Sequence, residues 1–128
     1  MAELINTLDY EQAAQTEIPE SFFGYYAGGA ADEITLREHR TVFNRIKLRP
    51  RVLTNVSQRA LDTTILGQAT AMPIIITPTA MAKLAHPEGE VAIAQAAKKA
   101  GIIQCLSTLS NASLEEIAAV GAANWYQV

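Results

Sequence analysis

A short apolar run that breaks into a proline-containing turn carries the first candidate chemistry of this chain. Ile74–Thr77 leads into Pro78-Thr79-Ala80, and residues that start a helix follow from Pro87. This order is typical of a βα unit in a parallel sheet, where the strand is buried on both faces. The backbone of Pro78, Thr79 and Ala80 would then lie at the carboxyl end of a strand, where a cofactor ring can lie against it.

The other residues that could transfer protons or bind metals have ordinary structural interpretations. His39 falls in an expected helix and His86 precedes a helix start, so a capping or solvent-exposed role is favoured over that of a catalytic base. Lys83 and Arg49 are interpreted as surface charges. Cys105 is the only cysteine, which excludes a disulfide within the chain, and its apolar neighbours indicate a buried strand residue. We expect no metal site here.

Composition excludes several classes of function. The 128 residues are 49% hydrophobic, enough for a core, and the net charge of −3 with scattered basic residues argues against nucleic-acid binding. The apolar stretches fall short of the roughly 18 residues that a membrane-spanning helix needs. The first 15 residues contain acids and no basic region leading into an apolar core, unlike a secretory signal. A soluble, intracellular protein without membrane or nucleic-acid partners is expected.

Residues 1–70 are expected to form an amino-terminal helical segment with short covering strands. Gly28-Gly29 should end the second helix, and the charged surface of the third indicates that one apolar face packs on something larger. The predicted helices are Asp9–Thr16, Glu20–Ala27 and Asp32–Arg45, and the predicted strands are Leu48–Leu53 and Leu61–Gly67.

From residue 71 the pattern becomes strand, helix, strand, helix, strand. The first helix should begin at Pro87 and end before Gly101, and Ser113 with Glu116 forms a capping box for a second helix that ends at Gly121. The predicted strands are Ile74–Thr77, Ile102–Leu106 and Asn124–Val128. Three parallel strands linked by helices are the start of either a (β/α) barrel or a doubly wound sheet.

Each helix is expected to bury one apolar face. Spacing places Ile93, Ala96, Ala97 and Ala100 on one side of the first helix, and the second should turn Leu114, Ile117 and Ala118 inward.

The final strand predicts that more chain belongs to this fold. An apolar parallel strand at the end of a sheet would leave an unpaired edge, which natural folds cover or charge. Three strands cannot close a barrel, which takes eight strands and typically ~250 residues. We therefore expect the 128 residues to be the front part of a longer protein or one piece of a divided chain.

Three segments carry a specific series of motifs over most of the chain. They are GYYAGGAADEITLREHRTVFNRIKLRPRVL, ILGQATAMPIIITPTAMAKLAHPEGE and the final WYQV. With these motifs the chain resembles the amino-terminal third of the FMN-dependent L-2-hydroxy acid oxidases, the family of glycolate oxidase and L-lactate oxidase. The resemblance implies an α/β fold, a TIM (β/α)8 barrel preceded by a helical segment, with residues 71–128 as the first part of the FMN-binding barrel.

The resemblance also implies roles for individual residues. Tyr25 matches the tyrosine that donates a hydrogen bond to the substrate carboxylate, a role suited to an uncharged donor. Pro78, Thr79 and Ala80 match the turn that faces the flavin, with the Ala80 amide directed at N5. Ser107 and Gln127 match the groups that bind the pyrimidine edge of the flavin. The resemblance thus implies that the turn Pro78–Ala80, Ser107 and Gln127 all belong to the cofactor site.

One position departs from the plant glycolate oxidases and bears on the substrate. Those enzymes carry a Trp two residues beyond the serine, whereas this chain has Leu109 after Ser107-Thr108. A smaller side chain leaves room for a methyl group, so L-lactate is favoured over glycolate as substrate, by about 1 to 3 kcal/mol. Met81 is equally well interpreted as part of this pocket or of the core.

The family reaction oxidises an L-2-hydroxy acid to a 2-oxo acid, with FMN reoxidised by O2 to give hydrogen peroxide. Its histidine base, its lysine and its two arginines match nothing before residue 128, so we expect no catalytic residue and no turnover in the isolated chain. The resemblance favours a homo-oligomer, a tetramer or octamer, in the cytoplasm of a bacterium rather than in a peroxisome. Two alternatives stay open: a noncatalytic fragment that needs the remainder of the barrel, and a dehydrogenase with another electron acceptor.

Overall fold

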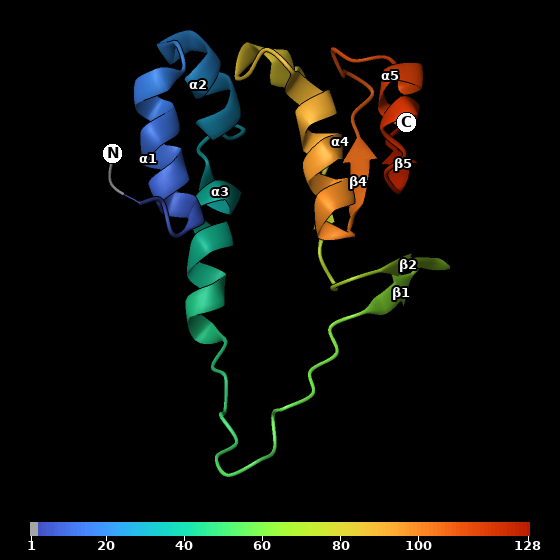
Figure 1. Cartoon of the computed structure of the whole chain (residues 1–128). Helices are drawn as coiled ribbons and strands as arrows, with labels where there is room; N and C mark the ends of the chain where they lie inside the picture. Colours follow the sequence, from blue (N-terminus) through green and yellow to red (C-terminus); the bar gives the residue numbers. More distant parts are fainter. Residues whose placement is uncertain (1–2) are drawn as a thin grey trace. The chain divides into compact units, whose positions relative to one another are not determined.

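The computed structural model describes residues 3–128, which form two compact units (Figure 1). The units divide between Ser57 and Gln58, earlier in the chain than the change of sequence pattern near residue 70. The hairpin at residues 63–70 thus belongs to the second unit.

The first two predicted helices, Asp9–Thr16 and Glu20–Ala27, are confirmed in the first unit. They are α1 (Thr7–Glu17) and α2 (Glu20–Ala27), which pack against each other (Figure 1). α1 begins earlier than predicted because the Asn6 side chain accepts hydrogen bonds from the backbone amides of Leu8 and Asp9, at 2.8 and 3.1 Å.

The third predicted helix, 32–45, is shorter and changes type. α3 spans Ile34–Thr41 and is followed by a 3-10 turn, η1 (Val42–Arg45). Glu33 adopts a left-handed conformation with φ 56°, so the helix cannot begin before Ile34. An ion pair between Arg40 and Glu11 connects α3 to α1.

The predicted strand Leu48–Leu53 is wrong. Within residues 3–57 the structure has no strand, and Leu48, Val52 and Leu53 are highly exposed. A strand needs a partner for its hydrogen bonds, and Pro50 has no N–H to donate. None of the described residues of this unit is buried, so its helices do not enclose a core of their own.

The second unit opens with an antiparallel hairpin of β1 (Thr63–Ile65) and β2 (Gln68–Thr70). Leu66 and Gly67 form the two-residue turn, with φ values of 48° and 82°. Positive φ at both central residues is typical of the type I′ hairpin turn, whose twist matches that of the flanking strands. The observed strand β1 is therefore shorter than the predicted strand 61–67, and β2 was not predicted from the sequence.

Three parallel strands form the central sheet, in the order β3, β4, β5. β3 (Ile75–Ile76), β4 (Ile103–Leu106) and β5 (Asn124–Tyr126) are linked by the helices α4 (Gly89–Ala100) and α5 (Leu114–Val120) (Figure 1). Cys105 of β4 lies opposite Trp125 of β5. The predicted alternation is confirmed, and the sequential strand order fits part of a barrel.

The ends of both helices are set by local residues. Gly101 ends α4 in a left-handed conformation, φ 67°, and its amide donates to the carbonyls of Ala97 and Lys98. The capping box of Ser113 and Glu116 starts α5 as predicted. α4 begins at Gly89 and not at Pro87 as predicted. Gly89 has a positive φ of 48°, so the residues before it cannot continue the helix toward the amino terminus.

The core lies where α4 and α5 cover β4. Ala94, Leu106, Ala112 and Ile117 form its buried cluster, with Val91 and Val120 at its margin. The predicted faces are partly wrong: Ala96, Ala100, Leu114 and Ala118 are exposed. α4 packs on α5 as well as on β4, so its buried stripe is shifted to Ala94 and Ala97. Cys105 is half-buried rather than buried.

None of the helices formed by residues 3–128 combines the length and the apolar character needed to cross a bilayer.

Candidate functional site

Three of the predicted site segments lie at one edge of the parallel sheet. Pro78-Thr79-Ala80 follows β3, Ser107 follows β4 and Gln127 follows β5. Because the carboxyl ends of parallel strands meet at the same edge, the structure brings these segments to a common side.

The turn after β3 offers a backbone donor. Ala80 is half-buried and Thr79 is exposed, while Pro78 has no N–H. Across the described part of the chain, the Ala80 amide donates no hydrogen bond. The next residue, Met81, has a left-handed φ of 53° and leads into the 3-10 turn η2 (Ala82–Leu84).

Ser107 and Gln127 offer side-chain groups. Ser107 is buried, and its Oγ accepts a hydrogen bond from the Leu109 amide at 3.1 Å, so the hydroxyl proton can still be donated. The backbone of Gln127 is held by two bonds, from its amide to the Leu106 carbonyl at 2.9 Å and from Thr108 Oγ1 to its carbonyl at 3.0 Å. Its exposed side-chain amide makes no hydrogen bond with residues 3–128.

The loops after β3 and β4 are joined to each other. The Met81 amide donates to the Leu109 carbonyl at 3.0 Å, and the Lys83 amide donates to Asn111 Oδ1 at 3.3 Å. Glu90 of α4 accepts from the amides of Ala82 and Asn111 through one oxygen, Oε1, at 3.0 Å each. The sequence alone does not predict this connection, because an acid such as Glu90 in the first turn of a helix is common for its favourable interaction with the helix dipole.

The two residues predicted to contact substrate lie in different units. Leu109 belongs to the loop after β4, and its side chain is 63% exposed. Tyr25 lies on α2 of the first unit, and its half-exposed ring meets the ring of Tyr26 edge to face, with 5.3 Å between centroids. The phenol hydroxyl of Tyr25 makes no hydrogen bond with the described residues.

Both histidines are exposed in the structure. His86 Nδ1 accepts a hydrogen bond from the Glu88 amide at 3.3 Å, and His39 lies on α3. The described residues contain no group of three or more acidic, histidine or cysteine side chains that could hold a metal ion.

The amide of Ser113 and the positive charge of Lys83 hold the pKa of Glu116 below its ordinary value of 4.5.

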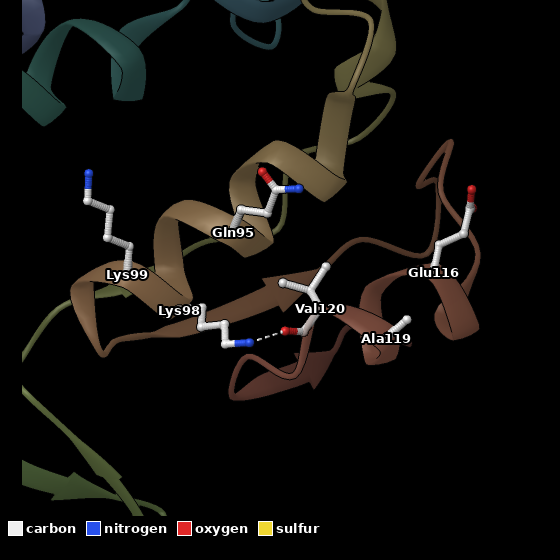
Figure 2. Close-up of a pocket in the computed structure, with 6 residues that line it drawn as sticks. All are labelled: Gln95, Lys98, Lys99, Glu116, Ala119 and Val120. Atoms are coloured by element: carbon white, nitrogen blue, oxygen red, sulfur yellow. Dashed lines mark hydrogen bonds between the residues drawn. The ribbon is translucent and has the colours of Figure 1, made fainter.

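A hollow between α4 and α5 is separate from the strand ends. Figure 2 shows Lys98 reaching from α4 to the Val120 carbonyl, 2.7 Å away, whereas Lys99 points elsewhere. Gln95, Glu116 and Ala119 complete the lining. Every lining residue comes from the two helices, and the bond from Lys98 satisfies a carbonyl at the end of α5.

A family model described as FMN-dependent dehydrogenase matches residues 14–128. The chain belongs to this family. FMN is the cofactor of the FMN-dependent dehydrogenases, and the resemblance in the motifs is confirmed.

Two curated relatives illustrate the family. An L-lactate oxidase of Nostoc sp. is 52% identical over 129 residues, which cover 97% of this chain and 35% of the relative. The glycolate oxidase of Spinacia oleracea is 49% identical over 119 residues, which cover 93% of this chain and 32% of the relative. The chain thus spans about a third of the length of these relatives.

Solved structures agree with this placement. A soluble mutant of the (S)-mandelate dehydrogenase from Pseudomonas putida has a TM-score of 0.90 at 38% identity, covering 98% of this chain and 36% of that one. A mandelate oxidase has a TM-score of 0.89 at 40% identity, covering 94% and 37%. Another mandelate oxidase structure contains an FMN adduct.

Proposed function

We propose that this chain is the amino-terminal portion of an enzyme that oxidises an L-2-hydroxy acid with FMN, with L-lactate favoured over glycolate and O2 reduced to hydrogen peroxide. The observation that carries the proposal is the common edge of the sheet at which Ala80, Ser107 and Gln127 follow three successive strands, in a chain of the FMN-dependent dehydrogenase family. The remaining strands of an eight-stranded barrel, and the catalytic histidine, lysine and arginines, would come from the rest of the protein.

The donors at the strand ends fit a flavin. Among residues 3–128 the Ala80 amide has no acceptor, Ser107 has a hydroxyl proton to donate, and the Gln127 side chain can both donate and accept. We assign the Ala80 amide to the flavin N5 and the other two groups to the pyrimidine edge. Pro78 and Thr79 complete the turn, and the small Ala80 side chain lets the ring approach. FMN bound at these residues would supply the acceptor for the hydride equivalent of the substrate.

Tyr25 and Leu109 would act on the substrate. The Tyr25 hydroxyl is an uncharged donor without a partner among the described residues, as binding of a carboxylate requires. Leu109 would leave space for the methyl group of lactate. The Nostoc L-lactate oxidase is 52% identical and the Spinacia oleracea glycolate oxidase 49% identical, so the proposed preference for L-lactate rests on Leu109.

The experiment uses the full-length protein. We expect a yellow protein with flavin absorbance that releases peroxide faster with L-lactate than with glycolate. A full-length protein that is colourless and gains no flavin on addition of FMN would contradict the proposal, and faster glycolate turnover would refute the substrate preference.

A dehydrogenase that passes electrons to another acceptor is the second candidate. The chain resembles a solved (S)-mandelate dehydrogenase and a solved mandelate oxidase equally well, with TM-scores of 0.90 and 0.89, so both electron acceptors are tested. Turnover with an artificial electron acceptor in the absence of O2, together with slow peroxide release in air, would identify this activity.

A third candidate is a noncatalytic segment that needs the missing barrel. The lack of any buried residue among residues 3–57 favours it for the isolated chain. Adding the separately produced remainder of the protein should restore flavin binding if the segment only completes the barrel.

We further propose a homo-oligomer, a tetramer or octamer, in the cytoplasm of a bacterium. The similarity to a Nostoc protein supports the bacterial setting. Light scattering of the full-length protein would measure the oligomeric state.

A further inference from the structure

We propose that Glu90 is a positioning residue that holds the two flavin-facing loops together through one carboxylate oxygen. The inference rests on the proposed function, because that function makes the loops after β3 and β4 parts of the flavin site.

The geometry of Glu90 is that of a clamp. Its side chain is 1% exposed, and Oε1 accepts from the Ala82 amide of one loop and the Asn111 amide of the other, at 3.0 Å each. Ala82 lies two residues after Ala80, and Asn111 lies two residues after Leu109. One oxygen atom thus connects the segment that would contact the flavin with the segment that would contact the substrate.

The loops are under backbone strain that the clamp helps to hold. Met81, between Ala80 and Ala82, has a left-handed φ of 53°, which a residue with a side chain adopts only when its surroundings enforce it. The bond from the Met81 amide to the Leu109 carbonyl and the bond from the Ala82 amide to Glu90 Oε1 act on the same stretch. Without Glu90, the turn after Ala80 would lose one of its attachments to the second loop.

Burial shows that Glu90 does more than fill space. A buried carboxylate is costly unless hydrogen bonds compensate for lost water, and an apolar side chain would fill the same volume without this cost. Its second oxygen, Oε2, has no partner among the described residues, and Gln104 Nε2 reaches only the Glu90 backbone carbonyl, at 3.5 Å. The bonds from the two loop amides are therefore the compensation that Glu90 receives.

Two conservative variants separate reach from charge. Glu90→Gln keeps the length and one carbonyl oxygen, whereas Glu90→Asp keeps the charge but is shorter by one methylene. If Glu90 acts as a clamp, the Glu90→Gln variant should retain kcat and the flavin spectrum. The Glu90→Asp variant should lower kcat by roughly tenfold to 10²-fold, as expected for a small misplacement of the reacting groups. Glu88→Gln, at an exposed acid just before the same helix, is the matched control and should behave like the wild type.

Amide hydrogen exchange tests the clamp without relying on activity. In the full-length protein, with and without FMN, the amides of Ala82 and Asn111 should be protected in the wild type and in Glu90→Gln and should exchange faster in Glu90→Asp. Free exchange of either amide in the wild type would overturn the proposal. So would equal effects of the Gln and Asp variants on exchange, or loss of protection spread evenly over α4 and β4. A protein that binds no flavin but shows the predicted exchange would refute the proposed function and leave the clamp intact.

Discussion

The Met81 amide donates to the Leu109 carbonyl at 3.0 Å, so the turn proposed for flavin contact and the residue proposed for substrate selection are joined through their backbones. Because the bond uses only the Leu109 carbonyl, the Leu109 side chain can be exchanged without removing it. The effect of the Leu109 side chain on substrate specificity can thus be measured without removing the hydrogen bond that joins the two loops.

Leu109→Trp should shift specificity toward glycolate. The larger ring would occupy the space that the lactate methyl group needs, and we expect the ratio of kcat/KM for L-lactate to that for glycolate to fall by about tenfold or more. Leu109→Met, which conserves volume, is the control and should leave the ratio near that of the wild type. An unchanged ratio in the Trp variant would show that Leu109 does not line the substrate pocket.

Tyr25→Phe should weaken substrate use. Removing a hydrogen bond to a charged group costs about 1.5 to 3 kcal/mol, so we expect kcat/KM for L-lactate to fall by roughly ten- to 100-fold while the flavin spectrum is unchanged. Steady-state kinetics of the full-length protein measures this. Tyr10→Phe, on the exposed surface of α1, should have no effect; equal kinetics of both variants would argue against Tyr25 as a substrate ligand.

Gly89→Ala should destabilise the protein. A Cβ at Gly89 would lie 2.6 Å from Lys83 Cγ and 3.0 Å from the Lys83 backbone nitrogen, and φ is 48°, so we expect a loss of about 1 to 3 kcal/mol in the free energy of unfolding. Urea denaturation measures it. Gly24→Ala in α2, where a Cβ meets nothing within 4 Å, is the control and should stabilise by about 0.5 to 1 kcal/mol.

The cap of α5 should weaken in acid. Hydrogen bonds from Ser113 and the charge of Lys83 lower the pKa of Glu116 in the folded state, so its contribution to stability is present above the ordinary value of 4.5 and is lost as pH falls through the lowered pKa. Glu116→Gln should therefore reduce the free energy of unfolding near neutral pH and have less effect at acid pH.

The control for the cap is Glu115→Gln, since Glu115 makes no hydrogen bond with Ser113. Urea denaturation at both pH values should show the pH-dependent difference for Glu116→Gln alone. A difference that stays constant with pH would exclude the proposed effect of the carboxylate.

Sequence patterns predicted best the features that depend on residues a few positions apart. The capping box of Ser113 and Glu116 and the end of α4 at Gly101 were confirmed because each is formed by hydrogen bonds within one helical turn. The three parallel strands were likewise predicted from short runs rich in apolar residues, but only β4 is largely buried, whereas β3 is half-buried and β5 is half-buried to exposed. By contrast, Leu48–Leu53 has the composition of a strand but no partner strand within its unit, and no local pattern reports a missing partner.

The sequence by itself determined the family, the order of strands and helices in residues 71–128, and the candidate residues at the strand ends. Only the tertiary structure decided that Glu90 joins two loops, since its bond to the Asn111 amide spans 21 positions of the chain. It also decided which faces of α4 and α5 are buried, because that depends on how the helices pack on each other as well as on β4. Local hydrogen bonds follow from neighbouring residues, whereas long-range bonds exist only once the chain has folded.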